Sequence, residues 1–169
     1  MKELTISQEL LRACFALGLQ GYPEEACGVL AGPESDPLRL TAVYPVKNIL
    51  NRLHAEDPVR YPRTAAEGYV LDPKEHMLLE RKLSQAGQTI RVIFHSHVDV
   101  GAYFSEEDTR RALWDGEPLF PGVAYLVCGI KERRPDGAIL ARFDAGTRNF
   151  TETRILAPGT GLTGSDLQP

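Results

Sequence analysis

Residues 90–108 read IRVIFHSHVDVGAYFSEED, in which an apolar, β-branched run typical of a buried strand ends in two histidines. Because residues i and i+2 of a strand point to the same face, the imidazoles of His95 and His97 should stand side by side over one volume. Two neutral imidazoles so placed form half of a zinc site, and Asp108 is the nearest downstream candidate for the third ligand. The spacing H-x-H-x7-S-x-x-D therefore predicts a metal centre with an open position for water.

The end of this stretch also has a purely structural interpretation. Ser105 is a typical helix N-cap, and the acidic residues that follow it are favoured in the first turn of a helix by the backbone amides and the macrodipole. A structural histidine accounts for one ring but leaves two adjacent polar rings to be hydrogen-bonded in an apolar strand end. The interpretations are compatible, because a helix capped by Ser105 can present Asp108 to a metal held by the preceding strand.

The spacing resembles the signature of the JAMM (MPN+ or JAB) metalloproteases, which is an upstream Glu followed by H-x-H-x7-S-x-x-D. Residues 25–30 (EACGVL) resemble the Glu-x-x-Gly element before the first strand of that family, and residues 69–73 (YVLDP) resemble the short strand before its central helix. The resemblance covers residues 8–145. It implies an α/β (mixed α+β) fold class, in which a single MPN/JAB-like domain has a mixed, mostly antiparallel β-sheet flanked by helices. Four positions match without a gap: His95, His97, Ser105 and Asp108.

The resemblance also implies a role for each residue of the site. Three residues would bind one Zn²⁺ per chain: His95, His97 and Asp108. Glu25 would be the general base that takes a proton from water and passes it to the leaving amine. The Ser105 hydroxyl would donate to the oxyanion, a contribution of about 3 kcal/mol. The implied reaction is amide hydrolysis without a covalent enzyme intermediate.

The chain resembles most the small stand-alone bacterial members of the family. These resemble enzymes that trim an amino acid or peptide from the Gly-Gly end of ubiquitin-like sulfur carrier proteins. The expected substrate is therefore a ubiquitin-like or sulfur carrier protein, cleaved at an amide or isopeptide bond after its C-terminal Gly-Gly. Many members have Pro where this chain has Val98 and Phe104. Those two substitutions are expected to reshape the rim around the tail of the substrate.

Two alternatives belong to other functional classes. A non-catalytic MPN scaffold that binds a partner protein usually loses ligands, whereas here the whole set is intact. A deaminase needs a Glu two residues after the His and a P-C-x-x-C pair, whereas here Asp99 follows and no cysteine pair exists. A Cys27 nucleophile is disfavoured because no histidine lies near it in a recognisable pattern.

The composition indicates one domain, residues 1–157, followed by a flexible tail at residues 158–169 that is rich in Gly, Thr, Ser and Pro. A net charge of -4 with a pI near 5.6 gives no broad basic surface for nucleic acid. No apolar stretch is long enough to span a membrane, and no signal peptide is evident. An odd number of cysteines outside any C-x-x-C spacing indicates buried thiols and a reducing cytoplasm. The oligomeric state is left open.

Periodicity and turn chemistry predict the remaining elements. Residues 51–68 have no clean period and are expected to form a flap beside the active site or a variable surface loop. His54 and His76 are expected at the surface, and a helix capped by Asp72 should pack through Met77, Leu78 and Leu83. The predicted helices are residues 7–20, 73–86 and 105–114; the predicted strands are 26–31, 38–49, 69–71, 89–97, 122–130, 138–144 and 150–156, with a hairpin turn at 133–137.

Overall fold

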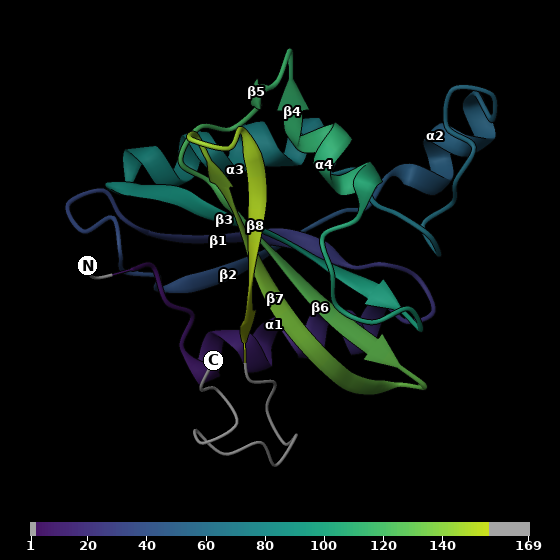
Figure 1. Cartoon of the computed structure of the whole chain (residues 1–169), viewed down its shortest axis with the longest axis horizontal. Coiled ribbons are helices and arrows are strands. Elements are labelled where there is room, and N and C mark those ends of the chain that lie inside the picture. Colours follow the sequence, from purple (N-terminus) through teal and green to yellow (C-terminus); the bar gives the residue numbers. More distant parts are fainter. Residues whose placement is uncertain (1–2, 156–169) are drawn as a thin grey trace.

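The structure is a computed structural model that describes residues 3–155. Its main strands are β1 (Cys27–Pro33), β2 (Ala42–Val46), β3 (Gln88–Val98), β6 (Ala124–Lys131), β7 (Arg134–Asp144) and β8 (Asn149–Ile155). They form a six-stranded sheet in the order β2-β1-β3-β6-β7-β8 (Figure 1). The β3–β6 pair is parallel and the other pairs are antiparallel, so the predicted mixed, mostly antiparallel sheet is confirmed.

Helices cover both faces of this sheet. They are α1 (Gln8–Gly21), α2 (Leu50–Glu56), α3 (Pro73–Gln85) and α4 (Glu106–Ala112). Figure 1 shows α1 on one face, α3 and α4 on the other, and α2 projecting to the side. The predicted N-cap Asp72 is confirmed, because its side chain accepts from the amide of Lys74, and the helix predicted from residue 7 is capped by Ser7, whose side chain accepts from the amide of Leu10.

The central strand β3 is buried on both faces, which explains its nearly continuous apolar sequence. Val92 and Phe94 point to the core beneath α1, whereas Ile93 points to the second core beneath α3 and α4. By the same alternation His95 and His97 face the α3 and α4 side, and Ser96 faces α1. The sheet therefore presents both imidazoles to the helix that carries Asp108.

Three predicted extents between β1 and β3 are wrong. The strand expected at residues 38–49 is only Ala42–Val46. It ends there because the next carbonyl, that of Lys47, accepts from the amide of Asp72 at the start of α3 and not from β1. The strand expected at residues 69–71 is a single bridge between Asn48 and Leu71. The segment 51–68, expected without regular structure, begins in α2, which is anchored by the buried Leu50.

The face through which α3 packs also differs from the prediction. Met77 and Leu78 are about half exposed, at 52% and 49%. The packed stripe is instead His76, Leu79 and Leu83, which follow the i, i+3, i+7 spacing of a helix face. His76 is thus not a plain surface residue, because its ring packs edge-on against the ring of Phe120, with 5.5 Å between centroids.

Two hairpin turns shift the predicted boundaries. The fourth helix ends at Ala112, not near Trp114, because β4 (Leu113–Trp114) pairs with β5 (Glu117–Pro118) around a turn with positive φ at Asp115 and Gly116. This Asp-Gly pair suits a two-residue type I′ turn. The β6–β7 turn lies at residues 132 and 133, both with positive φ, so the expected turn residues 135–137 lie within β7. The edge strand predicted at residues 150–156 is confirmed as β8, and the predicted tail lies outside the described residues.

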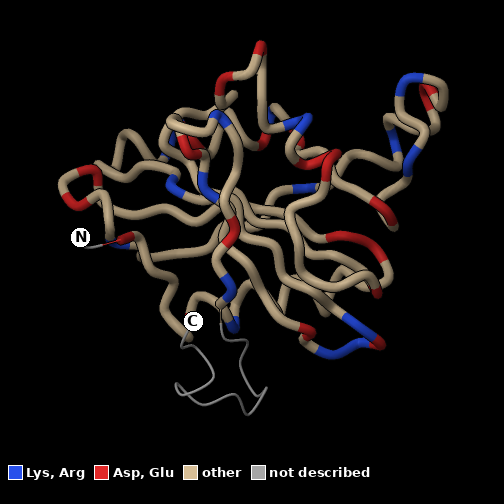
Figure 2. The backbone as a smooth tube through the Cα atoms, viewed as in Figure 1, with Lys and Arg blue, Asp and Glu red and all other residues tan. Residues whose placement is uncertain are grey.

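The three cysteines are free and buried, as predicted. Burial raises the pKa of Cys14 and of Cys27 to about 12, which leaves little thiolate for a nucleophilic role. Figure 2 shows basic and acidic residues interspersed around the periphery of the molecule. Within residues 3–155 no helix is both long enough and apolar enough to cross a membrane.

The packing of α3 can be tested with two leucines of the same helix. Leu83→Ala should lower the free energy of unfolding by about 2–4 kcal/mol, because it opens a cavity at a buried position. Leu78→Ala should change it by about 0.5 kcal/mol or less, because that side chain is half exposed. Urea unfolding followed by circular dichroism measures both, and equal losses would contradict the observed packing face.

Candidate metal centre

The three predicted ligands meet at the end of β3. The Nε2 atoms of His95 and His97 lie 3.2 Å apart. Asp108, in the first turn of α4, places Oδ1 at 3.3 Å from Nε2 of His95 and Oδ2 at 3.5 Å from Nε2 of His97. All three residues are buried, and one ligand atom from each lies within 4.8 Å of the others. The strand geometry inferred from the sequence thus brings these groups together in space.

The separations suit a metal ion of the size of zinc. Ligands arranged tetrahedrally at about 2.1 Å from zinc lie about 3.4 Å from one another. The Nε2–Nε2 distance of 3.2 Å is close to this value, and each imidazole has one oxygen of Asp108 at 3.3 or 3.5 Å. Nδ1 of His97 lies 3.0 Å from the carbonyl oxygen of Gly101, which can only accept, so Nδ1 carries the proton and Nε2 offers its lone pair to the cluster. If His95 likewise has its proton on Nδ1, three acceptors face one point, an arrangement that a cation satisfies. Nδ1 of His95 is buried without a hydrogen-bond partner among the described residues.

The electrostatics of the cluster favour an ionised Asp108 and a neutral His95, whereas the pKa of His97 is raised because the carboxylates of Asp108 and Glu25 outweigh its burial. Burial alone would raise the pKa of Asp108, but His95 and hydrogen bonds from the surrounding groups hold that pKa well below its ordinary value. Burial lowers the pKa of His95. These are the protonation states that metal ligands need, because a carboxylate and a neutral imidazole each offer a lone pair.

A glycine on the neighbouring strand permits the contact that orients His97. Gly129 of β6 lies opposite His97 in the parallel ladder. A Cβ at this glycine would lie 3.1 Å from the backbone nitrogen of Ala102 and 2.5 Å from the carbonyl oxygen of Asp136. The absence of a side chain therefore lets residues 101 and 102 pass close to β6, with the carbonyl of Gly101 beside the imidazole of His97.

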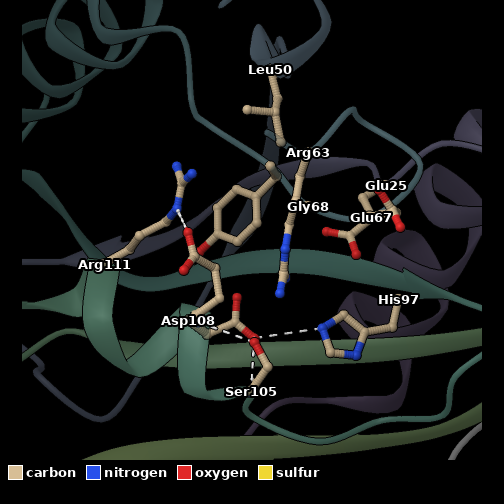
Figure 3. Close-up of a pocket in the computed structure, with 11 residues that line it drawn as sticks. Glu25, Leu50, Arg63, Glu67, Gly68, His97, Ser105, Asp108 and Arg111 are labelled. Atoms are coloured by element: carbon tan, nitrogen blue, oxygen red, sulfur yellow. Dashed lines mark hydrogen bonds and ion pairs between the residues drawn. The ribbon is translucent and has the colours of Figure 1, made fainter. Parts of the chain in front are cut away.

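Ser105 and Asp108 form a capping box at the start of α4. The amide of Asp108 donates to Oγ of Ser105 at 3.1 Å, and the amide of Ser105 donates to Oδ2 of Asp108 at 2.9 Å. The Ser105 hydroxyl also donates to Oδ2 at 2.6 Å (Figure 3). Both interpretations of the sequence thus apply to this helix start, because the cap that begins α4 also orients the carboxylate.

Glu25 lies just before β1 and lines the same small pocket, of about 20 Å³, as His97, Ser105 and Asp108 (Figure 3). It is only 6% exposed, and burial raises its pKa to about 8. It does not belong to the three-ligand group. A divalent cation held by its neighbours would lower this pKa, since positive charge favours the carboxylate form. The geometry is that of a carboxylate beside a metal site and not within it.

Two residues that support Glu25 were missed by the sequence analysis. Nδ2 of Asn48 donates to the carbonyl oxygens of Glu25 and Gly68, at 2.9 and 3.0 Å. Oγ of Ser96 accepts from the amide of Ala26 at 2.8 Å. The only sequence signal for Ser96 is its position between the two histidines, on the opposite face of the strand, and nothing in the sequence marks Asn48.

The segment that follows β2 forms one wall of the pocket. Its contribution consists of Leu50, Arg63, Glu67, Gly68 and Tyr69. The ring of Tyr69 stacks on that of His95 with 4.2 Å between centroids. His54 lies apart from the three-ligand group and is half-buried, with Nδ1 at 2.7 Å from the carbonyl oxygen of Tyr61. The predicted position of this segment beside the site agrees with the structure, while a flap movement stays a prediction.

The expected effect of Phe104 on the rim is wrong. Phe104 is 8% exposed and packs in the second core against Tyr125 and Phe150, with ring centroids 5.1 and 4.8 Å away. Neither Phe104 nor Val98 lines the pocket that contains Glu25. Phe104 therefore secures the start of α4 to the sheet instead of shaping the approach to the site.

The sequence of the chain is similar to a known protein family and to two characterised proteins. The family described as prokaryotic homologs of the JAB domain matches residues 7–139. The chain is 37% identical over 119 residues to the desampylase of Haloferax volcanii, covering 70% of this chain and 68% of the relative. It is 31% identical over 109 residues to the CysO-cysteine peptidase of Mycobacterium tuberculosis, covering 64% and 65%. The aligned region thus spans about two thirds of each relative.

Solved structures share the fold. A protein from Desulfitobacterium hafniense superimposes with a TM-score of 0.62 and 23% identity, covering 89% of this chain and 90% of that one. A protein from Salinibacter ruber gives 0.59 and 23%, with 96% and 95% covered. At this level of identity the likeness concerns the fold alone.

The metal content of the purified protein tests the three-ligand group. About one equivalent of zinc per chain is expected, and His97→Ala or Asp108→Ala should lose it, because each removes one of three ligands. His54→Ala serves as the control and should keep the metal, since His54 lies outside the group. Elemental analysis measures the content. Freshly purified protein without divalent metal, together with unchanged activity in chelator, would rule out the site.

Proposed function

The chain belongs to the family of prokaryotic homologs of the JAB domain and is a JAMM-type hydrolase, and we propose that it is a zinc-dependent metallopeptidase. Its proposed reaction is hydrolysis of the amide or isopeptide bond after a C-terminal Gly-Gly of a ubiquitin-like or sulfur carrier protein. One observation carries the proposal: three acceptor groups converge at distances that suit zinc, and the separate, buried carboxylate of Glu25 lines the same pocket. The names of the two relatives support the substrate class.

In this proposal His95, His97 and Asp108 hold the metal. Bound zinc would supply an open position for water, lower the pKa of that water towards about 7 and polarise the scissile carbonyl. Glu25 takes the proton of the attacking water and gives it to the leaving amine as the carbon–nitrogen bond breaks. Its shielded position suits this task, because a carboxylate with a raised pKa is a stronger base than one in water.

Ser105 is proposed to act on the oxygen of the scissile carbonyl. Its hydroxyl lies at the pocket, as such a donor must, but it already donates to Oδ2 of Asp108. To donate to the substrate, the hydroxyl has to turn away from that carboxylate. The backbone amide of Ser105 continues to hold Oδ2 when it does so. Asp108 therefore keeps its orientation while the hydroxyl changes partners.

The alternative of a non-catalytic scaffold is disfavoured by the completeness of the set. A scaffold has no need for a buried carboxylate beside three buried acceptors, since each such group costs desolvation free energy. A deaminase-like site is disfavoured as well, because no cysteine belongs to the three-ligand group and the thiol of Cys27, opposite His95 in the sheet, donates to the carbonyl oxygen of Val46.

The role of Glu25 is separable from metal binding. Glu25→Gln should keep zinc and lower kcat by about 100-fold or more, because it removes a proton acceptor but no ligand. Glu24→Gln is the matched control, since this neighbour is exposed and bonds to Asn51. Zinc content and single-turnover cleavage measure the two properties. Loss of zinc from the Glu25 variant would mean that Glu25 is itself a ligand.

The substrate is tested with carrier proteins extended past Gly-Gly. The zinc-loaded enzyme should release the residue that follows the second glycine, because a tail without side chains can enter a narrow pocket. Intact mass spectrometry of the products measures this. Replacement of both glycines by Ala or Val should abolish cleavage, and equal cleavage of that variant would instead indicate a general peptidase.

A further inference from the structure

Arg63 is the unpaired cation of the catalytic pocket. Two arginines line this pocket, and Nε of Arg111 is held by Oε1 of Glu107 at 2.6 Å. Arg63 makes no hydrogen bond or ion pair within the described part of the chain, although its charge lowers the pKa of Glu25. Figure 3 shows its side chain extending into the pocket towards Asp108 and His97. The residue is solvent-exposed, so an incoming substrate can reach it.

The backbone near Arg63 is tied to Glu25. The amide of Glu25 donates to the carbonyl oxygen of Ala65 at 2.7 Å, and the amide of Ala65 donates to Oδ1 of Asn51 at 2.8 Å. Arg63 lies only two residues before this anchor, between α2 and α3. The backbone that carries Arg63 is therefore held beside the proposed general base.

The charge of the pocket determines what Arg63 can bind. Besides the paired Glu107, the lining has three carboxylates, and these come from Glu25, Glu67 and Asp108. Bound zinc would partly offset the charge of Asp108, but its open position serves water and the scissile carbonyl. Glu25 and Glu67 would still repel a negatively charged substrate group that meets no further cation. An unpaired guanidinium offers five donors in a planar fork that matches a carboxylate. Arg63 thus provides a place for one anionic group of the substrate.

The proposed reaction supplies such an anion in one kind of substrate. When a single amino acid follows Gly-Gly, its carboxylate is attached to the same α-carbon as the scissile nitrogen, so it enters the pocket with the bond to be cut. Each additional residue carries the free carboxylate about 3.3–3.6 Å further away. A lysine side chain in an isopeptide bond places no free carboxylate next to the scissile nitrogen.

We propose that Arg63 binds the α-carboxylate of the residue released, and that it makes the site selective for a single amino acid after Gly-Gly. This inference rests on the proposed function. Arg63 thereby determines specificity and is not required for bond cleavage itself. Substrates with an uncharged tail are cut without its help.

The test crosses two substrates with four enzymes. A ubiquitin-fold carrier ending in Gly-Gly-Ala is prepared with a free C-terminal carboxylate and, separately, with a C-terminal amide. The zinc-loaded full chain is compared with Arg63→Ala, Arg63→Lys and Arg60→Ala. Arg60 is the matched control, because it lies on the same segment, outside the pocket, with its guanidinium over the ring of Tyr61.

The unmodified enzyme should prefer the acid over the amide by about 10-fold or more in kcat/KM, as expected for a charge-assisted contact. Arg63→Ala should lose this preference, so that the ratio of kcat/KM for acid over amide falls to about one through a higher KM for the acid. Any change in kcat that follows from the altered pKa of Glu25 should affect both substrates alike and leave the ratio unchanged. Arg63→Lys should keep part of the preference, and Arg60→Ala should keep all of it. A third substrate, the Gly-Gly-Ala carrier extended by two residues after the Ala and ending in a free carboxylate, should be cleaved with a lower kcat/KM than the Gly-Gly-Ala acid.

Other outcomes overturn the inference in distinguishable ways. Equal cleavage of acid and amide by the unmodified enzyme would overturn the role of Arg63 and leave the proposed function intact. An equal loss on both substrates in Arg63→Ala would mean that Arg63 acts through Glu25 or the local structure, and it would overturn carboxylate recognition. Failure of the zinc-loaded enzyme to cut either substrate would overturn the proposed function and the inference together.

Discussion

Desolvation of polar groups at one end of β3 is the constraint on which the rest of the site depends. Within residues 3–155 all the fully buried polar or charged side chains gather there: Glu25, His95, Ser96, His97 and Asp108. Groups of this kind destabilise a fold unless they find partners. The capping hydroxyl of Ser105, the carbonyl of Gly101 and the backbone of Ala26 supply some of these partners. Three facing acceptors are left for a cation.

The features that could be predicted from the sequence are those with local causes. Period-two alternation alone places His95 and His97 on one face of a strand, and a capping pattern alone places Asp108 in the first turn of a helix. The family signature then supplied Glu25. The roles of Asn48 and Gly129 could not be predicted, because they depend on which strands lie beside β1 and β3, and no local pattern encodes that order.

The mispredicted elements show tertiary context overriding local chemistry. Pro135 and its neighbours have the residues of a turn, but the pairing of β7 with β6 places the turn at Glu132 and Arg133. On α3 the apolar pair Met77 and Leu78 defined the wrong stripe, because the helix packs through Leu79 and Leu83. In both cases the long-range pairing determined the outcome and the propensity did not.

The parallel pairing of β3 with β6 has a consequence for the order of assembly. A parallel pair needs a long crossover, and here residues 99–123 form it and carry Asp108. The apolar side of α4 packs in the core cluster that Tyr125 of β6 shares with Ile93 of β3, so its packing surface is complete only when β6 has joined the sheet. During synthesis the histidine pair therefore emerges well before its carboxylate partner is in place. An ion held by His95, His97 and Asp108 would tie the end of β3 to the start of α4, so metal binding would close part of the crossover loop as well as equip the site.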